Sequence, residues 1–259
     1  EEVVTLKNAK MLINQIDKDF GSDFIIAMAP VQSSLEINEP GLGGFIYKDL
    51  YNSKEGQRID YFNTQFYFDF SSPFGYFAAT KIRAIGDEFG REVSWKPFMI
   101  GAALKVTGGM PLPMVPLKGD YSKKDMERTS RLWNVPYTQP EKFPISSQAP
   151  CRLIYWLQDV APERQEEAIL KLYQAYFVEG LDISSPEVAA RVISSIKGSQ
   201  DELVAVTQNE NIKARLKDEC ELAIKKGVFG SPFIIVDDEP FWGSDRLEQV
   251  REWLKTGGF

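Results

Sequence analysis

The sequence predicts an α/β protein in which a β-α-β unit and a β-β-α unit are separated by a long helical insertion. Three observations support this prediction. Residues 65–98 contain two apolar runs of strand length on either side of a helical pattern. Residues 100–226 are mostly helical in pattern, and two short apolar runs and a last helical pattern follow Gly227. An N-terminal α/β extension, residues 1–64, precedes these units.

The N-terminal extension is expected to hold a helix and a strand. A helix over residues 5–17 collects its apolar side chains on one side, and the turn at 19–22 ends it. The continuous apolar run at 23–30 is bounded by turn residues, which is typical of a buried parallel strand. Residues 32–44 are polar and rich in Gly and Pro, so they predict a loop.

The β-α-β unit begins with a strand over residues 65–70. A helix over residues 73–89 follows, with Pro73 in the first turn, where proline is tolerated. The second strand covers residues 92–98. A unit this short predicts parallel strands joined by a right-handed crossover.

Six helices are expected in the insertion, over residues 123–133, 150–158, 163–179, 186–197, 200–208 and 209–226. Several prolines make residues 110–150 rich in loops around the first of them.

The C-terminal unit is expected to contain strands over residues 233–237 and 240–242, followed by a helix over 246–255. Ser244 or Asp245 is a candidate cap for this helix. The complete order is that of a thioredoxin-like core interrupted by a helical insertion domain. Residues 65–99 and 227–259 form the thioredoxin-like domain, and residues 100–226 form the insertion.

Composition excludes several classes of function. The net charge is −7 and the basic residues are scattered, so no basic stripe is available for a nucleic acid. The longest apolar runs are too short to cross a bilayer, and no segment has the pattern of a signal peptide. We therefore expect a cytoplasmic protein with no nucleic-acid or membrane partner.

The sequence contains no histidine. This absence excludes Ser-His-Asp and Cys-His catalysis and nearly every ordinary zinc site, so no metal is expected. The two cysteines, Cys151 and Cys220, are far apart in sequence and outside any C-x-x-C motif, which excludes a dithiol cycle of that kind. They are interpreted as buried, unpaired thiols in a reducing compartment.

Ser72 lies at the turn from the first strand of the core into the first helix. Free N–H groups and a partial positive charge at a helix start stabilise an anion, and thioredoxin-like folds hold their reactive sulfur there. A hydroxyl at this point can donate a hydrogen bond to a bound thiolate and lower the pKa of that thiol. The alternative is that Ser72 is only a helix N-cap.

The segment before the third strand of the core reads Gly230-Ser231-Pro232. This pattern fits a cis Ser231-Pro232 bond, which leaves the backbone N–H and C=O of Ser231 free to pair with an extended peptide. The alternative is a trans proline at a strand start. Ser244 and Asp245 place a carboxylate at a second helix start, where it can pair with an α-ammonium group or serve only as a cap.

Five segments occur in the order and spacing of one known family: FYFDFSSPFGYFAATKI, SWKPFMIGAALKVTGG, PLKGDYSKKDMERT, FPISSQAPCR and GVFGSPFIIVDDEPFWGSDRL. With these segments, residues 65–259 resemble the 2-hydroxychromene-2-carboxylate isomerase and kappa-class glutathione transferase family. The resemblance implies a DsbA-like thioredoxin fold, a helical insertion and reduced glutathione as cofactor.

The resemblance also implies roles for individual residues. Ser72 corresponds to the serine that faces the glutathione sulfur, and Ser231, before Pro232, to the residue that pairs with the cysteinyl backbone. Ser244 and Asp245 correspond to the clamp on the γ-glutamyl group.

Three further site residues follow from the same resemblance. Lys118 corresponds to a lysine near the glycyl carboxylate. Phe74 and Ser146 are candidates for the substrate site, although Ser146 lies in FPISS where the family commonly has FP-x-Asn-Ser. A small aromatic or electrophilic substrate and a homodimer are expected.

Residues 1–64 resemble a different family, the family 18 chitinase-type barrel. Glu1-Glu2 lies near the position of that family's catalytic acid, and LINQIDKDFGSDFIIAMAP resembles the helix and strand that follow. A complete barrel needs about 250 residues, so we expect no glycosidase activity from this fragment. The two resemblances meet at residues 65–67, as a fusion, an engineered chimera or an aberrant gene junction would produce.

The expected function is that of a glutathione-dependent isomerase of the 2-hydroxychromene-2-carboxylate type, in which Ser72 stabilises the glutathione thiolate. One alternative is a kappa-class glutathione S-transferase that conjugates small electrophiles. A second is a thiol-binding, thioredoxin-like module without turnover. A third is a carbohydrate-binding remnant built on residues 1–64.

Overall fold

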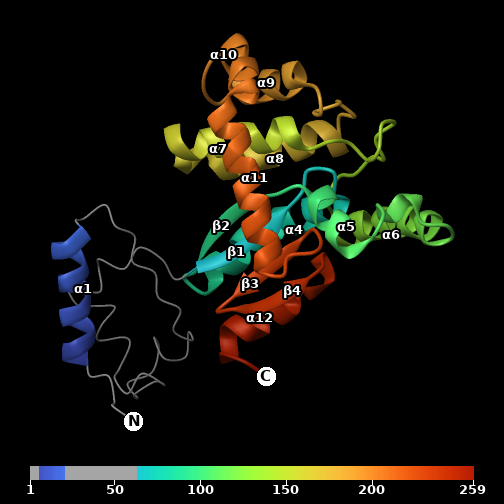
Figure 1. Ribbon diagram of the computed structural model, residues 1–259. Coiled ribbons are helices and arrows are strands. Elements are labelled where there is room, and N and C mark those ends of the chain that lie inside the picture. Colours follow the sequence, from blue (N-terminus) through green and yellow to red (C-terminus); the bar gives the residue numbers. More distant parts are fainter. Residues whose placement is uncertain (1–5, 21–62) are drawn as a thin grey trace.

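A four-stranded mixed sheet forms the centre of the computed structural model, which describes residues 6–20 and 63–259 (Figure 1). The strand order is β2-β1-β3-β4, with bounds β1 Asn63–Phe68, β2 Glu92–Pro97, β3 Phe233–Val236 and β4 Glu239–Trp242. β1 and β2 are parallel, whereas the β1–β3 and β3–β4 pairs are antiparallel. This is the thioredoxin-like arrangement predicted from the order of the elements.

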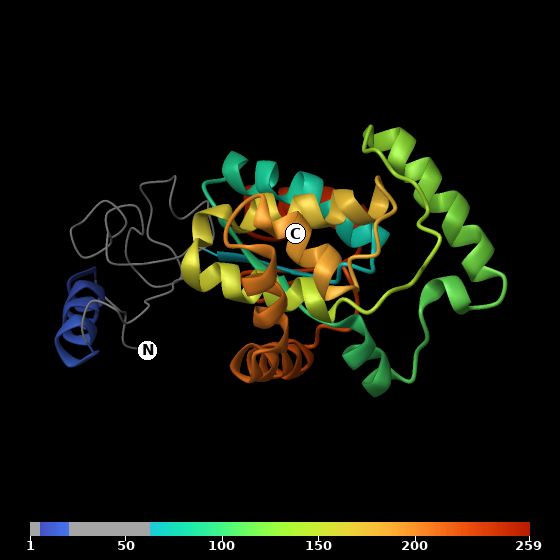
Figure 2. The same cartoon turned by 90° about the horizontal axis from the view of Figure 1, so that it is seen from above.

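The helices are α1 Leu6–Phe20, α4 Pro73–Glu88, α5 Ile100–Thr107, α6 Lys118–Trp133, α7 Gln148–Val160, α8 Gln165–Phe177, α9 Pro186–Ser194, α10 Gln200–Gln208, α11 Glu210–Lys225 and α12 Leu247–Thr256. Short 3-10 turns lie at Leu112–Met114, Pro162–Arg164 and Ser244–Arg246. Helices α7 to α10 stack above the sheet in Figure 1, whereas α6 and the loop after it stand off from the rest in Figure 2.

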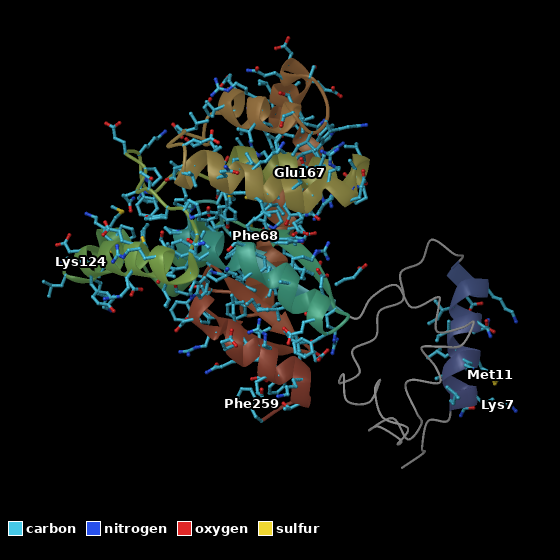
Figure 3. The ribbon with its side chains drawn as sticks, turned by 180° about the vertical axis from the view of Figure 1, so that it is seen from behind. Lys7, Met11, Phe68, Lys124, Glu167 and Phe259 are labelled. Carbon is cyan, nitrogen blue, oxygen red and sulfur yellow. The ribbon has the colours of Figure 1, made fainter. Side chains whose placement is uncertain are left out.

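Successive side chains of β1 point to opposite faces of the sheet. Phe66 and Phe68 lie on one face, where Trp95 packs edge-on against Phe66 at a centroid distance of 5.2 Å. Tyr173 of α8 completes this aromatic layer beneath α4. Figure 3 shows Phe68 inside the body, with Phe259 at its outside. This layer explains the aromatic-rich sequence at the first strand of the core.

Helix α11 crosses the other face (Figure 1). Lys226, just after it, donates to the side chain of Gln65 at 2.8 Å, and Glu219 faces Lys96 at 3.9 Å. Burial and the nearby Glu219 raise the pKa of Tyr67, on the same face, to about 12. These polar contacts add to the burial of Leu216, Cys220 and Ala223, which anchor α11 in the core.

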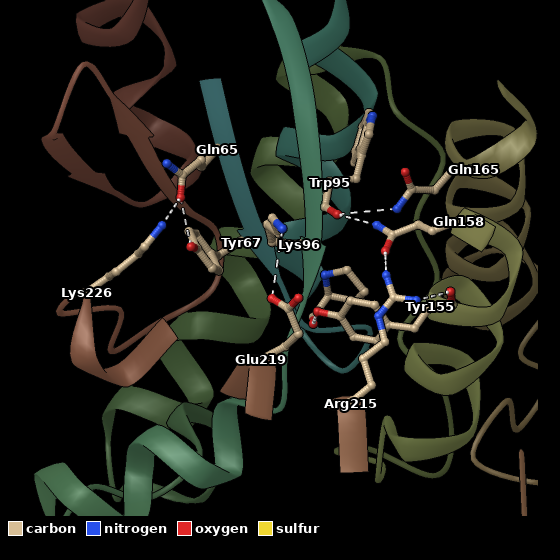
Figure 4. Close-up of polar contacts among 11 residues, drawn as sticks. Gln65, Tyr67, Trp95, Lys96, Tyr155, Gln158, Gln165, Arg215, Glu219 and Lys226 are labelled. Atoms are coloured by element: carbon tan, nitrogen blue, oxygen red, sulfur yellow. Dashed lines mark hydrogen bonds and ion pairs between the residues drawn. The ribbon is translucent and has the colours of Figure 1, made fainter. Parts of the chain in front are cut away.

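The outer edge of β2 is covered by side chains of the insertion. The amide groups of Gln158 and Gln165 both donate to the carbonyl of Trp95, at 3.1 and 3.3 Å (Figure 4). At the end of the sheet where β2 begins and β3 ends, a buried pair joins Arg91 to Asp237 through two bonds of 3.0 and 2.9 Å. Both arrangements join segments that are distant in sequence.

Several predicted elements need correction. Helix α5 was not predicted, and α6 begins at Lys118 rather than residue 123 because it starts after Leu117, whose φ is +66°. The first strand of the core begins at Asn63, two residues earlier than predicted. The predicted strand at 23–30 lies outside the described residues, whereas the helix predicted over 5–17 is confirmed as α1.

None of the helices within residues 6–20 and 63–259 is long and apolar enough to cross a bilayer. The division of the chain into three domains stays a prediction.

Candidate functional site

Ser72 is the N-cap of α4, at the carboxyl end of β1. Its Oγ accepts a hydrogen bond from the N–H of Gly75 at 3.1 Å and donates one to the carbonyl of Ser231 at 2.8 Å. The side chain is buried, with 8% exposure, yet it lines a cavity. The capping role is therefore real and uses the oxygen, whereas the single hydrogen of the hydroxyl is donated to Ser231 and can serve a ligand only by turning away from that carbonyl.

The Ser231-Pro232 bond is cis, as predicted. The hydroxyl of Ser231 accepts from the backbone N–H of Asp69 at 2.9 Å, which connects this loop to the turn before α4. The prediction that both backbone groups of Ser231 are free is wrong for the carbonyl, because Ser72 already donates to it. The N–H of Ser231 makes no hydrogen bond to any residue in the described part of the chain.

The loop at Gly230-Ser231-Pro232, called here the proline loop, approaches α4 closely at Gly75. A Cβ there would lie 2.8 Å from the Tyr173 hydroxyl and 2.9 Å from Ser231 Oγ. Only glycine allows this approach, and it brings the Ser72 hydroxyl within reach of the loop.

A cavity of about 1260 Å³ opens beside Ser72. Seven of the eight residues predicted for the site line it: Ser72, Phe74, Lys118, Ser146, Ser231, Ser244 and Asp245. Pro232 is the exception, and it shapes the loop rather than lining the cavity. The volume exceeds that of a typical small-molecule pocket, about 300–1,000 Å³, so it has room for two ligands side by side.

The cavity lining includes the exposed carboxylate of Asp245. Ser244 is buried, whereas the side chain of Asp245 is 72% exposed and lies 3.7 Å from the Arg246 guanidinium. Helix α12 begins only at Leu247, and its N-cap, Arg246, makes no side-chain capping bond. The alternative that Ser244 or Asp245 caps this helix is therefore wrong.

Two lysines also line the cavity. Lys118 is the first residue of α6 and Lys105 belongs to α5; both side chains are exposed. Neither has an ion-pair partner among residues 6–20 and 63–259. Lys105 could not be predicted from the sequence, because no sequence pattern shows that α5 faces the cavity.

Aromatic side chains form the apolar walls. Phe74, Trp133 and Phe143 line the cavity on one side. Phe229 and Trp242, which sequence analysis also missed, pack against each other at 4.8 Å by the proline loop. Such walls suit an aromatic ligand.

Asp69 is a further residue that sequence analysis missed. It is 2% exposed, three residues before Ser72, and its carboxylate accepts from Ser71 N–H, Ser71 Oγ and Ile100 N–H. Burial raises the pKa of this carboxyl, although those hydrogen bonds oppose the rise. An acidic residue in the apolar run QFYFDF was the available signal.

Cys151 and Cys220 are both free and buried, as interpreted from the sequence. Burial raises the pKa of both thiols, and the nearby Asp69 carboxylate adds to the rise. Raised pKa values leave little thiolate at neutral pH, so neither sulfur has the character of a nucleophile. The part of the chain that the structure describes contains no group of three or more acidic or cysteine side chains suited to a metal ion.

Comparisons with known proteins agree with this geometry. The family model of the DSBA-like thioredoxin domain matches residues 64–255. A glutathione S-transferase kappa 2 of Caenorhabditis elegans is 27% identical over 203 residues, which cover 73% of this chain and 90% of the relative. A 2-hydroxychromene-2-carboxylate isomerase of Sphingobium xenophagum is 29% identical over 193 residues, which cover 73% and 96%.

A solved structure of a 2-hydroxychromene-2-carboxylate isomerase aligns with a TM-score of 0.68 at 22% identity, over 74% of this chain and 94% of that one. At this identity the likeness shows the fold alone. The family match begins at residue 64, and the matches described here give the chitinase resemblance of residues 1–64 no support.

Proposed function

The chain belongs to the DSBA-like thioredoxin domain family, and within it we propose that this protein is a glutathione-dependent isomerase of the 2-hydroxychromene-2-carboxylate type. One observation carries the proposal. A buried serine hydroxyl lies at a helix start, 2.8 Å from the carbonyl of a cis-proline loop, beside a large cavity with aromatic walls. The relatives' names, isomerase and glutathione S-transferase, support an enzyme of this kind.

Glutathione fits the donors and acceptors of the cavity. A carbonyl of its peptide backbone can accept a hydrogen bond from the N–H of Ser231, which has no other acceptor among the described residues. Its γ-glutamyl ammonium finds Asp245, while the unpaired ammonium of Lys118 suits the glycyl carboxylate. Ser244 and Arg246 lie beside Asp245 and suit the γ-glutamyl carboxylate.

The hydroxyl of Ser72 has a single hydrogen, which it donates to Ser231. To hold a thiolate, this hydrogen turns from the carbonyl to the sulfur, while Oγ continues to accept from Gly75. A hydrogen bond to a charged group is roughly twice as strong as one between neutral groups, so the thiolate wins this competition. The start of α4 adds the favourable end of a helix dipole.

In the proposed reaction the glutathione thiolate adds to the conjugated carbon–carbon double bond of the hydroxychromene and forms a carbon–sulfur bond. The former double bond can then rotate. The carbon–sulfur bond breaks again, which releases glutathione and an isomer of the substrate. The cavity holds the aromatic acceptor between Phe74, Trp133 and Phe143, with Ser146 at its edge. Burial of Ser72 keeps water away from the hydroxyl that would face the sulfur.

The second candidate is a kappa-class glutathione S-transferase, favoured by the similarity to the Caenorhabditis elegans relative. In that reaction the thiolate displaces a leaving group and stays attached to the acceptor. We further propose that the enzyme acts in the cytoplasm, where the glutathione pool is reduced. We also propose that it forms a homodimer, which analytical ultracentrifugation would detect.

Two measurements test the proposal. Calorimetry compares binding of glutathione with that of ophthalmic acid, a tripeptide of the same shape that lacks the sulfur. Turnover is then measured with 2-hydroxychromene-2-carboxylate and with a chlorinated nitrobenzene. Failure to bind glutathione refutes the proposal, turnover of the nitrobenzene alone favours the transferase, and binding without any turnover favours the thiol-binding module.

A further inference from the structure

The start of α5 depends on a residue that is distant in sequence. Met99, the N-cap, is apolar and offers no side-chain capping bond, so the first amides of the helix need another acceptor. Asp69 Oδ2 accepts from the N–H of Ile100 at 2.6 Å, and the sulfur of Cys220 accepts from the N–H of Met99 at 3.3 Å. The carboxylate therefore replaces the missing cap.

The same residue also holds the turn that carries Ser72. Asp69 Oδ1 accepts from the N–H and the hydroxyl of Ser71, both at 2.7 Å. Its backbone carbonyl accepts from the N–H of Ser72 at 2.9 Å and from the hydroxyl of Tyr173 at 3.1 Å. The two carboxylate oxygens therefore face different segments, one the turn and the other the helix.

The proline loop is the third segment that Asp69 contacts, because the backbone N–H of Asp69 donates to Ser231 Oγ at 2.9 Å. The turn, the loop and α5 all line the cavity, and α5 brings Lys105 into its wall. No cation within residues 6–20 and 63–259 pairs with the carboxylate. Hydrogen bonds to these three segments, together with one from the side chain of Ser147 at the start of α7, account for its position.

We infer that Asp69 is a positioning residue, which fixes the α5 wall of the cavity relative to the hydroxyl of Ser72. The inference rests on the proposed function, because it concerns the distance between the sulfur at Ser72 and an acceptor held against α5. Loss of the Asp69–Ile100 bond frees the start of α5, while Ser72 keeps its own bonds to Gly75 and Ser231. The expected defect is in turnover rather than in glutathione binding.

The first variant is Asp69→Asn. An amide has one acceptor oxygen, so it serves either Ser71 or Ile100 and presents N–H groups to the other. We expect kcat and kcat/KM to fall together by about 10- to 100-fold, with KM for glutathione unchanged, because the misplaced wall acts at the transition state.

The matched control is Asp237→Asn, at a carboxylate that is also largely buried but bonds Arg91 outside the cavity. It is expected to lower the melting temperature and leave kcat unchanged.

A second variant keeps the test decisive if Asp69→Asn does not fold. Ile100→Pro removes the N–H that donates to Asp69 and also shortens a side chain that lines the cavity, at the first helical position, where proline is tolerated. Its reference is Ile100→Val, which keeps that N–H. We expect a lower kcat for Ile100→Pro than for Ile100→Val.

The inference is overturned if Asp69→Asn folds and retains the kcat of Asp237→Asn, or if Ile100→Pro retains the kcat of Ile100→Val. These outcomes are distinct from failure of the proposed function, which shows in the wild-type protein as the absence of glutathione binding or turnover.

Discussion

Replacement of Ser72 by alanine separates the two uses of its hydroxyl. The variant removes the acceptor for the N–H of Gly75 and the donor that we assign to the thiolate. Loss of a hydrogen bond to a charged group costs about 1.5–3 kcal/mol. Since about 1.4 kcal/mol corresponds to a tenfold change in rate, turnover should fall by about 10- to 150-fold. The hydroxyl must give up its hydrogen bond to Ser231 to bind the thiolate, so its net stabilisation of the thiolate is smaller. The expected fall in turnover is therefore in the lower half of this range.

The loss of the cap has its own cost. An N-cap serine contributes about 1 kcal/mol, which corresponds to about 2–4 °C in melting temperature for a chain of this size. Ser185→Ala is a matched control, because Ser185 also precedes a proline and caps α9 by accepting from Val188 at 3.3 Å. Its melting temperature should fall by a similar amount while turnover stays at the wild-type rate.

The assay measures turnover at saturating glutathione, together with the ultraviolet absorbance of the bound thiolate. The alanine variant should show less thiolate than the wild type at neutral pH. Wild-type turnover in Ser72→Ala, with a melting temperature lowered as in Ser185→Ala, would falsify the catalytic assignment and leave Ser72 as a cap alone.

Three other predictions follow from the geometry. Asp245→Ala should weaken glutathione binding by about 1.5–3 kcal/mol by calorimetry and leave the melting temperature unchanged, because Asp245 caps no helix; unchanged affinity would contradict its assignment. Cys151 and Cys220 should react slowly with a thiol reagent in the native protein and rapidly in urea, since burial raises the pKa of both thiols and lowers the thiolate fraction at neutral pH; rapid native labelling would show that one of them is accessible. A chain of residues 63–259 should fold and bind glutathione as the full chain does, and loss of its circular dichroism signal would place the N-terminal segment in the core. The cut lies before Asn63 because β1 begins there.

The positions with a local signature in sequence were the ones that could be predicted. Ser72 stands before a proline at a helix start, and Ser231 stands before a proline at a strand start; both patterns depend on neighbouring residues alone. The local pattern at Ser231-Pro232 fitted a cis bond but left a trans proline open, and the structure has the cis form. The fold brings both into one cavity, as expected from the β-α-β and β-β-α order.

The features that were missed depend on contacts between distant segments. Helix α5 begins at an apolar cap because a carboxylate 31 residues earlier accepts from its first amide. The start of α6 follows Leu117, a residue in a backbone region that favours glycine, so no sequence rule marks it. Asp69 did have a local signal, as a carboxylate in an aromatic strand, but its hydrogen-bond partners become visible only in the fold.

The cavity draws its two sides from different stretches of the chain. In the proposed reaction the turn after β1 and the proline loop bind the sulfur, whereas residues 99–148 provide most of the remaining cavity wall. Selection on the insertion can therefore change which electrophile is accepted without disturbing thiol activation. For protein engineers, this makes the loop between α5 and α6 the place to randomise when a new acceptor is sought, with Ser72, Ser231 and Asp69 held constant.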